Sequence, residues 1–433
     1  MKHHLVVKLR TRLEEPLPIP DWMTFIGDKS AAVTSLERDV DRVLRSVRRD
    51  FWVTHEYRPA QGPGWTGIET HHGLDRTYRL VLTDSTERLP DEVVARIAAL
   101  PAVEGVHQLE VVDTTIPRDQ TALAESLPGG QPDLVGLDFA RAVTRGRPDV
   151  RVAVLDTGVN LNHPELVGKI VARADFVDLE GLDTSTFVGD VLGYDDDPED
   201  ELGHGTHVAG IIAATGRHME PGVAPECRLM AVRVLGTLRD GDRLQGAGIV
   251  DNINPAIKWA VDQGADVINM SLGIRHTGGG LPHEDVIRYA LAQGVTVVAA
   301  SGNDGTDTKY YPGALPGVVA VGAVDAAGQV ASFTSYGAPI TVVAPGVNVL
   351  SSYARGRYAM ASGTSQAAPY VAGAVALLKS CARDNDRRLD VAGVATILRE
   401  TSDRLDDRPR SPHAGFGLIN LTDSFKWLLS SLN

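Results

Sequence analysis

From about Gly136 onward, apolar runs of strand length alternate with stretches of helical periodicity. The strand-like runs are VRVAVLD, LMAVRVL, DVINMSLG, VTVVAASGN and GVVAVGAV, and the helical stretches include THVAGIIAAT, IVDNINPAIKWAVDQG and EDVIRYALAQG. Runs that are apolar throughout, and not only at every second residue, are typical of strands buried on both faces of a parallel sheet. The region therefore predicts a three-layer α/β fold, in which helices cover both faces of a mostly parallel sheet.

The N-terminal region has a different texture, with short strand-like runs around two amphipathic helices. The order is a strand at Leu5–Arg10, a helix at Ser30–Arg49 with Ser30 as a candidate N-cap, strands FWVTHEY and RTYRLVLT, a helix LPDEVVARIAAL and a last strand VEGVHQLEVV. The order β-α-β-β-α-β is that of the ferredoxin-like arrangement. We expect a small α+β domain over residues 1–113, a linker rich in Pro, Gly and Asp over residues 114–133, and the α/β domain over residues 134–433.

The composition limits the classes of partner that the chain is expected to bind. A length of 433 residues with a hydrophobic fraction of 43% favours two domains with sizeable cores. The net charge of −14 opposes binding to nucleic acid or to an anionic membrane, so neither partner is expected. Two cysteines, Cys227 and Cys381, cannot form a disulfide framework and fit a reducing compartment.

The start of the chain, MKHHLVVKLRTRLEEPLP, lacks the apolar core of a signal peptide, and no segment is apolar over a length that spans a bilayer. We therefore expect a cytoplasmic protein, with secretion as the alternative.

Asp156 ends the strand-like run VAVLD and is followed by Thr-Gly. A lone aspartate in this position is most often a turn cap. An aspartic protease would need a second Asp-Thr/Ser-Gly element so that two carboxylates share a proton, and the chain contains none, because VVDTTIP lacks the glycine. An aspartate that orients a catalytic histidine is the third interpretation.

His204 lies in GHGTHVAGIIAA, where it is expected in the first turn of a helix. A metal site formed with His207 would need a third ligand, which no recognisable spacing provides, and His207 is expected to be a packed helix residue.

Ser365 lies in ASGTSQAAPYVAGAVALL, where Gly363 allows a tight turn and Pro369 suits the first turn of a helix. Ser365 is either an ordinary N-cap or a nucleophile whose own N–H can stabilise an oxyanion. Asn303, in VVAASGNDG, is either a turn residue or a side-chain amide donor to that oxyanion.

Taken together and in this order, these blocks resemble the subtilisin-like serine protease family over roughly residues 131–425. The resemblance rests on VAVLDTGV, GHGTHVAGIIAA, GVAP, VINMSLG, VVAASGNDG, YPGALPGVVAVGAVD, VVAPGVNVLSS and GTSQAAPYVAG. It implies that Asp156, His204 and Ser365 form a catalytic triad and that Asn303 donates to the oxyanion. No cofactor is required for that chemistry.

The resemblance also implies a substrate site. A protein or peptide substrate would lie as an added strand beside Ser271, Leu272 and Gly273, with the primary pocket closed on its other side by Ala300, Ser301 and Gly302. Because these residues are small, we expect the pocket to admit large apolar side chains.

The chain departs from the family pattern at four places. Gln366 replaces the usual Met after the nucleophile, and Tyr370 replaces a usual His and is expected to pack. The loop TGRHMEPGVAP lacks the Asn-rich run that binds calcium in many relatives, so calcium is doubtful there, although a structural cation elsewhere is open. The acidic run Asp195 to Glu201 is expected to be a solvated loop, with selection of basic substrate residues or a cation site as alternatives.

The N-terminal region resembles the prodomain of secreted subtilisins, which assists folding and inhibits the active site. The implied protein is a serine endopeptidase made as a zymogen, cut within about residues 112–120, with its own N-terminal domain as an intramolecular inhibitor. A retained regulatory domain is the alternative for that region. For the whole chain, the alternatives are a peptide ligase or macrocyclase that uses the same acyl-enzyme, and a non-catalytic peptide-binding protein.

Overall fold

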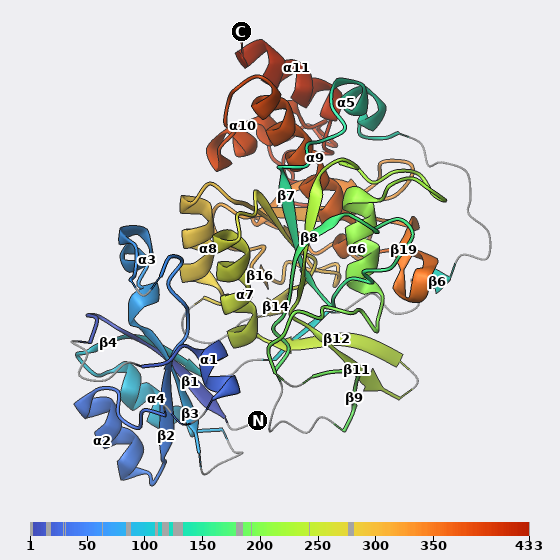
Figure 1. Cartoon of the computed structure of the whole chain (residues 1–433). Helices are drawn as coiled ribbons and strands as arrows, with labels where there is room; N and C mark the ends of the chain where they lie inside the picture. Colours follow the sequence, from blue (N-terminus) through green and yellow to red (C-terminus); the bar gives the residue numbers. More distant parts are fainter. Residues whose placement is uncertain are drawn as a thin grey trace.

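Seven parallel strands form the central sheet, in the order β18-β17-β15-β13-β7-β10-β8 (Figure 1). A computed structural model describes residues 3–13, 19–28, 30, 32–62, 64–83, 88–108, 111–114, 121–123, 133–178, 185–191, 193–241, 243–275 and 281–432. The strands of this sheet are β7 (Arg151–Asp156), β8 (Ile170–Asp175), β10 (Arg228–Arg233), β13 (Val267–Met270), β15 (Thr296–Ala300), β17 (Val319–Val324) and β18 (Ile340–Pro345).

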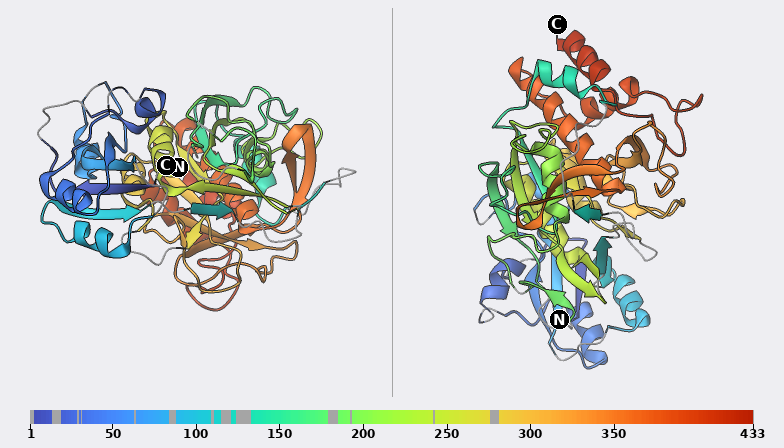
Figure 2. Two further views of the ribbon diagram at one scale, coloured as in Figure 1. Left: turned by 90° about the horizontal axis from the view of Figure 1, so that it is seen from below. Right: turned by 90° about the vertical axis from the view of Figure 1, so that its right-hand side faces the viewer.

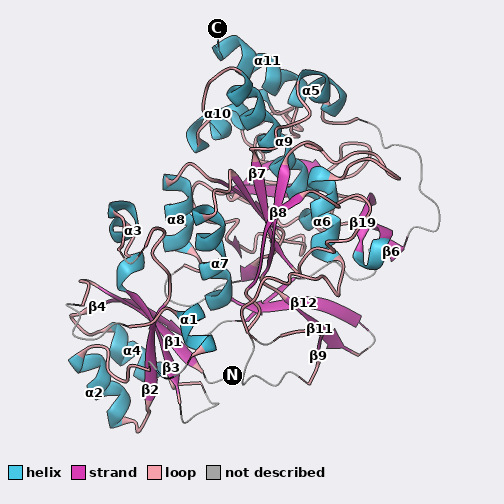
Figure 3. Cartoon of the chain, viewed as in Figure 1, coloured by secondary structure: helices cyan, strands magenta, loops and turns pink. Residues whose placement is uncertain are grey.

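Helices cover both faces of this sheet, as the α/β pattern predicts (Figure 3). In β7, Val152 and Val154 lie in one core and Ala153 and Leu155 in the other, so the strand is buried on both faces. The first core lies under α5 (Leu137–Val143), α6 (His204–Ala213), α9 (Thr364–Asp384), α10 (Val391–Thr401) and α11 (Leu421–Leu432), and the second lies under α7 (Val250–Asp262) and α8 (Glu284–Ala292). The three-layer prediction is confirmed.

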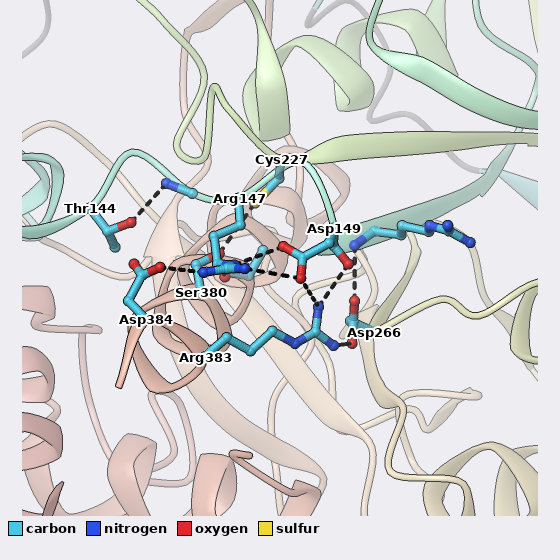
Figure 4. A network of polar contacts seen from close by, with 11 residues as sticks. Thr144, Arg147, Asp149, Cys227, Asp266, Ser380, Arg383 and Asp384 are labelled. Carbon is cyan, nitrogen blue, oxygen red and sulfur yellow. Dashed lines mark hydrogen bonds and ion pairs between the residues drawn. The ribbon is translucent and has the colours of Figure 1, made fainter. Parts of the chain in front are cut away.

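A polar network lies at the end of the central sheet where the parallel strands begin (Figure 4). The guanidinium of Arg147 contacts Asp149 at 2.7 Å and Asp384, the last residue of α9, at 2.6 Å. Arg383 donates to the carbonyl of Asp149 at 2.7 Å and pairs with Asp266 just before β13. The C-terminal end of α9 is thereby attached to the starts of two central strands.

The N-terminal lobe, coloured blue to cyan in Figure 2, contains a separate sheet. Its strands are antiparallel and follow the order β2-β3-β1-β4, as expected for the ferredoxin-like arrangement. Its strands are β1 (His4–Leu9), β2 (Phe51–His55), β3 (Thr77–Leu82) and β4 (Val103–Gln108), and its helices are α1 (Trp22–Gly27), α2 (Arg38–Ser46), α3 (Gly67–His71) and α4 (Asp91–Ala98). In β1, Leu5, Val7 and Leu9 alternate into a core with α2 and α4. The opposite face of the sheet lies against α7 and α8.

Buried charges dominate part of the contact between the two lobes. The carboxylate of Asp251, in α7, forms hydrogen bonds with the imidazole Nε2 atoms of His4 at 2.5 Å and of His107 at 2.9 Å. Arg79 of β3 forms a bidentate pair with Glu56 and also donates to the carbonyl of Asp251. A second contact joins Lys258 of α7 to Glu69 of α3 at 2.6 Å.

Two details of the N-terminal prediction are wrong. The predicted helix over Ser30–Arg49 begins only at Arg38, because Val33 forms an isolated bridge with Val53, and Glu37 caps the helix in place of Ser30. The predicted last strand is divided between two sheets, because β4 pairs in the N-terminal sheet whereas β5 (Val111–Thr114) pairs with β12.

Three smaller sheets surround the central one. They are formed by the strands β5, β12 (Arg243–Ile249), β11 (Gly236–Asp240) and β9 (Phe187–Val188), by β14 (Ile274–Arg275) with β16 (Tyr310–Tyr311), and by β19 (Val349–Tyr353), β20 (Arg357–Ala361) and β6 (Thr121–Leu123). Within the described residues, Cys227 and Cys381 are free and buried, and no helix is long and apolar enough to cross a bilayer.

Candidate active site

The candidate residues lie where parallel strands end and two helices begin. Asp156 is the last residue of β7, and Ser271 and Asn303 follow β13 and β15. His204 is the first residue of α6, and Ser365 is the second residue of α9, which packs against α6. Functional side chains gather at this end of α/β sheets because the carboxyl ends of the parallel strands meet there.

A close approach between β7 and α6 brings Asp156 and His204 together. A Cβ placed on Gly205 would lie 2.1 Å from the carbonyl oxygen of Gly158, so only glycine fits this crossing. The Nδ1 atom of His204 lies 2.6 Å from Oδ1 of Asp156, and both side chains are buried. Oδ1 of Asp156 also accepts the N–H of Thr157 at 2.8 Å, which fixes the carboxylate.

The Asp156 carboxylate determines the basicity of His204. Burial alone would lower the pKa of this imidazole, but the charge of Asp156 and its hydrogen bond outweigh that effect and raise the pKa above the usual 6.5. The buried Nε2 atom of His204 has no hydrogen-bond partner within the described part of the chain. It is therefore open to a nucleophile or substrate proton.

Ser365 is buried beside Ser271, and the two residues are joined twice. The Oγ of Ser365 donates to the carbonyl of Ser271 at 3.1 Å, and the Oγ of Ser271 donates to the carbonyl of Ser365 at 2.8 Å. The Ser365 hydroxyl is thus turned to Ser271 and does not contact His204 in this structure. A change of its χ1 rotamer is the motion that would bring it to the imidazole.

Asn303 is held by Thr364, the residue before Ser365. Its Oδ1 accepts the N–H of Thr364 at 2.8 Å and the Thr364 hydroxyl at 3.0 Å. These bonds assign the oxygen of the amide and direct its Nδ2 group to the other side. The structure therefore brings Asn303 to the first turn of α9, as the sequence predicts.

The two segments that were predicted to line the substrate site flank residues 364 and 365. Ser271 to Gly273 passes on one side through the Ser271–Ser365 bonds. Ala300 to Gly302 passes on the other, where the N–H of Gly302 lies 3.3 Å from the Thr364 hydroxyl. The expected space for large apolar side chains does not match this geometry, because the ring of Tyr310 packs against both Gly273 and Gly302.

Asp200 is a residue of the site that sequence reasoning missed. Its Oδ1 accepts the N–H of Gly203 at 2.7 Å and the hydroxyl of Thr157 at 2.9 Å, and its Oδ2 accepts the N–H and hydroxyl of Thr206 at 2.9 and 2.7 Å. The carboxylate therefore satisfies donors at the start of α6 and joins that helix to the residue after Asp156. The only sequence signal was its position four residues before His204, at the end of an acidic run.

The acidic run is thus divided between two environments. Asp195, Asp196 and Asp197 are exposed, as a solvated loop predicts, whereas Asp200 is buried. Glu201 approaches the buried Arg233 at 3.3 Å. The prediction of a wholly solvated loop is wrong for the C-terminal part of the loop, because the N–H groups at the start of α6 need a buried acceptor.

The loop after α6 is organised by a carboxylate. Glu165 accepts the Thr215 hydroxyl and the N–H groups of residues 216–218 at 2.6 to 2.9 Å, and the Tyr358 hydroxyl at 3.3 Å. Five donors directed at one carboxylate satisfy this anion, and a calcium ion would need oxygen ligands in their place. That calcium does not bind at this loop stays a prediction.

The described residues contain no group of three His, Cys, Asp or Glu side chains arranged to hold a metal ion. The Nε2 of His207 lies 3.1 Å from the carbonyls of Val349 and Ala359, so this histidine joins α6 to β19 and β20 as a packed residue. Burial lowers the pKa of His207 to about 4, which keeps the imidazole neutral.

The two departures on α9 differ in environment. Gln366 is buried, and its amide forms no hydrogen bond within the described residues. Tyr370 packs against the core under α9, as expected. It also lines a pocket of about 310 Å³ together with Arg141.

Two described strands that precede the α/β domain, β5 and β6, pair with strands of that domain. Strand β5 pairs antiparallel with β12, from Val111 opposite Ile249 to Thr114 opposite Gly246. Strand β6 pairs antiparallel with β20, from Thr121 opposite Ala361 to Leu123 opposite Ala359. Since Ala361 lies four residues before Ser365, β6 pairs with the strand that leads to the candidate nucleophile. The predicted cut within residues 112–120 falls partly on residues 115–120, which lie outside the described residues.

Comparisons with known proteins agree with this geometry. A model of the subtilase family matches residues 147–417. The chain is 44% identical over 271 residues to the thermophilic serine proteinase of Bacillus sp. (strain AK1), covering 62% of this chain and 60% of the relative. It is 38% identical over 303 residues to subtilisin DY of Bacillus licheniformis, covering 69% and 98% of the two chains. The solved structure of the prenylagaramide maturation protease PagA matches with a TM-score of 0.56 and 31% identity, over 68% of this chain and 98% of that one.

Proposed function

The chain belongs to the subtilase family, and from that premise we propose that it is a serine endopeptidase acting on proteins or peptides. The observation that carries the proposal is the buried Asp156–His204 contact of 2.6 Å beside the first turn of α9, where Ser365 lies. A binding protein has no need of a histidine whose pKa is raised by a buried carboxylate next to a serine. We propose that Asp156, His204 and Ser365 form the catalytic triad and that no cofactor takes part.

In the proposed first step, the Ser365 hydroxyl leaves Ser271 and turns to Nε2 of His204. As Oγ attacks the scissile carbonyl carbon, its proton passes to Nε2, and Asp156 holds Nδ1–H and stabilises the imidazolium. The carbonyl oxygen becomes an oxyanion, which the Nδ2 group of Asn303 and the N–H of Ser365 stabilise. A side-chain donor of this kind contributes roughly 3 kcal/mol to transition-state stabilisation.

The tetrahedral intermediate then collapses. The C–N bond breaks, and the leaving amine takes the proton from Nε2 of His204, which leaves an acyl-enzyme on Ser365. A water molecule, deprotonated by the same imidazole, attacks the ester carbonyl. The C–Oγ bond then breaks, Oγ of Ser365 takes back the proton from Nε2 of His204, and the acid is released. The raised pKa of His204 makes it a stronger base than a free imidazole for both proton transfers.

We propose further that the N-terminal domain inhibits this site within the same chain and is removed by cleavage of the connector. Its support is that β5 and β6, which precede the α/β domain, pair with β12 and β20, and β20 ends four residues before Ser365. The contacts of the buried His4 and Arg79 and of the partly exposed His107 with α7 hold the domain in place. The division into residues 1–113, 114–133 and 134–433 and the cytoplasmic location stay predictions.

The test uses a fluorophosphonate probe on the whole chain, as purified and after limited proteolysis of the connector. We expect labelling of Ser365 and hydrolysis of a peptide mixture, both abolished in Ser365→Ala. Ser362→Ala is the matched control and keeps both activities. Absence of labelling in both preparations would overturn the proposal, and N-terminal sequencing of the purified protein tests removal of the domain.

Peptide ligation is a second candidate, because a structural neighbour is named a maturation protease. It shares the acyl-enzyme and differs in the group that resolves it. Mass spectrometry of the products in the presence of an added amine peptide distinguishes the two. A free carboxyl terminus indicates hydrolysis, and a joined or cyclic product indicates ligation.

A further inference from the structure

The side chain of Tyr310 occupies a position where a substrate side chain would enter. This inference rests on the proposed function, since it concerns the residue whose carbonyl Ser365 attacks, here called P1. The segments Ser271 to Gly273 and Ala300 to Gly302 flank the nucleophile on its two sides. A P1 side chain held beside Ser365 would have to extend between them.

The ring of Tyr310 lies between the two glycines of those segments. A Cβ placed on Gly302 would lie 2.3 Å from Cδ2 of the ring, and one placed on Gly273 would lie 3.2 Å from Cδ1. The opposite edges of the ring are therefore in contact with the two walls. Gly302 also has a φ of +105°, so the wall follows a backbone path that admits the ring only because no Cβ is present.

Two hydrogen bonds hold the ring in this place. The Tyr310 hydroxyl donates to Asp304 at 2.6 Å and accepts the Nε–H of Arg275 at 2.6 Å, and Arg275 pairs with Asp304. Burial and the neighbouring Asp304 raise the pKa of Tyr310 to about 12, so the phenol remains a donor at neutral pH. The side chain is only 8% exposed.

The backbone adds a further restraint. Tyr310 lies in β16, which pairs antiparallel with β14 so that Tyr310 is opposite Arg275. The strand that carries the ring is thus bonded to the strand that continues from Gly273. Movement of the ring out of its place would break both hydroxyl contacts, one of which involves a charged carboxylate.

We propose that Tyr310 forms the floor of the primary pocket and restricts the protease to substrates with a small P1 residue, namely glycine, alanine or serine. Side chains as large as leucine or phenylalanine would have to displace the ring. This restriction contradicts the expectation of a pocket for large apolar side chains, which the small wall residues alone suggest. Arg275 and Asp304 act as positioning residues, because they hold the ring and do not touch the substrate.

The experiment compares fluorogenic peptides that differ only at P1, with alanine, leucine or phenylalanine. It uses the whole chain as purified or after limited proteolysis of the connector, with active sites counted by fluorophosphonate labelling. For the wild-type protein we expect kcat/KM to be at least tenfold higher for alanine than for phenylalanine. Tyr310→Gly is expected to raise kcat/KM for phenylalanine at least tenfold and to reverse the preference.

Two variants make the result specific. Tyr310→Phe keeps the ring and is expected to keep the preference for alanine, although with a weaker ratio because the hydroxyl contacts are lost. Tyr194→Ala removes a tyrosine that packs on Phe176 with ring centroids 4.9 Å apart, and is expected to change no P1 ratio. If Tyr310→Gly does not fold, Tyr310→Val, which suits a strand, carries the same expectation.

Equal hydrolysis of alanine and phenylalanine substrates by the wild-type protein overturns the inference. So does a folded, labelled Tyr310→Gly or Tyr310→Val variant that keeps the wild-type ratio. Failure of the proposed function is distinguishable from both, because it gives neither labelling nor hydrolysis with any P1 residue.

Discussion

Asp200 and Thr206 are joined by two hydrogen bonds, one from the N–H and one from the hydroxyl of the threonine to the same carboxylate oxygen. The other oxygen of Asp200 binds Gly203 and Thr157. The carboxylate thus fixes the first turn of α6, which carries His204, relative to the end of the strand that carries Asp156. Desolvation raises the pKa of Asp200 to about 6 in spite of these bonds.

Asp200→Asn is therefore expected to affect both stability and catalysis. The amide cannot accept at both positions, so it leaves buried donors without an acceptor, at a cost of about 2 kcal/mol or more. We expect a lower Tm and a fall in kcat of at least tenfold with a smaller change in KM, measured by calorimetry and peptide hydrolysis. Asp197→Asn, at an exposed position of the same run, is the control, and an equal loss there would contradict a positioning role.

The pH dependence of activity is expected to follow His204. The base must be neutral, and its pKa is raised above 6.5, so kcat/KM is full at alkaline pH and falls as the pH decreases through that raised value. Asp156→Asn removes the charge that raises the pKa and is expected to lower kcat by roughly 10⁴-fold. A pH profile from 5 to 10 measures both, and an acid limb with a midpoint below 6.5 in the wild-type protein would be inconsistent with this geometry.

Acid sensitivity of the fold is expected to depend on His207. Its pKa is about 4 in the folded chain and near 6.5 when unfolded, so the unfolded state binds the proton more readily between these values. Its contribution to stability is complete above pH 6.5 and is lost as the pH falls towards 4, by roughly 3 kcal/mol. Urea unfolding of wild type and His207→Gln at several pH values measures the difference. The exposed His413→Gln is the control, and parallel pH curves for wild type and His207→Gln would argue against this assignment.

The Glu165 loop is expected to be stable without a metal ion. Burial alone would raise the pKa of Glu165, but the hydrogen bonds from residues 215–218 outweigh it and lower the pKa. Oε2 of Glu165 accepts three hydrogen bonds. In Glu165→Gln this position holds either an amide nitrogen, which cannot accept them, or an uncharged oxygen, which accepts them more weakly, so Tm should fall by several degrees. EDTA should leave protection of residues 215–218 from hydrogen exchange unchanged, and exposed Glu220→Gln should not alter Tm. A loss of protection on chelation would show that a cation supports the loop.

The positions of the candidate catalytic residues could be predicted from sequence because each is fixed by a local signal. Asp156 and Asn303 follow apolar strands, and His204 and Ser365 begin helices beside glycine. The fold class was predictable for the same reason, since strand and helix periodicity is local.

Other features depend on contacts between distant segments. Asp200 acts as an acceptor because the start of α6 lies beside it, and a run of acidic residues does not reveal that arrangement. The content of the primary pocket depends on Tyr310, which follows its wall residue Gly302 by eight positions and reaches it only through the pairing of β14 and β16. The assignment of β4 and β5 to different sheets likewise cannot be read from strand propensity, because propensity does not determine which sheet a strand joins.

The contact between the lobes has a consequence for the life of the protein after processing. Asp251 and Lys258 on α7 are buried against the buried His4 and Glu69 of the N-terminal domain, and Asp251 also contacts the partly exposed His107. Burying such charges costs hydration energy, which is recovered when the partner leaves. If the domain is removed, this part of α7 becomes a hydrated, charged surface, so separation is made easier and the remaining enzyme gains solubility at the place where it was covered.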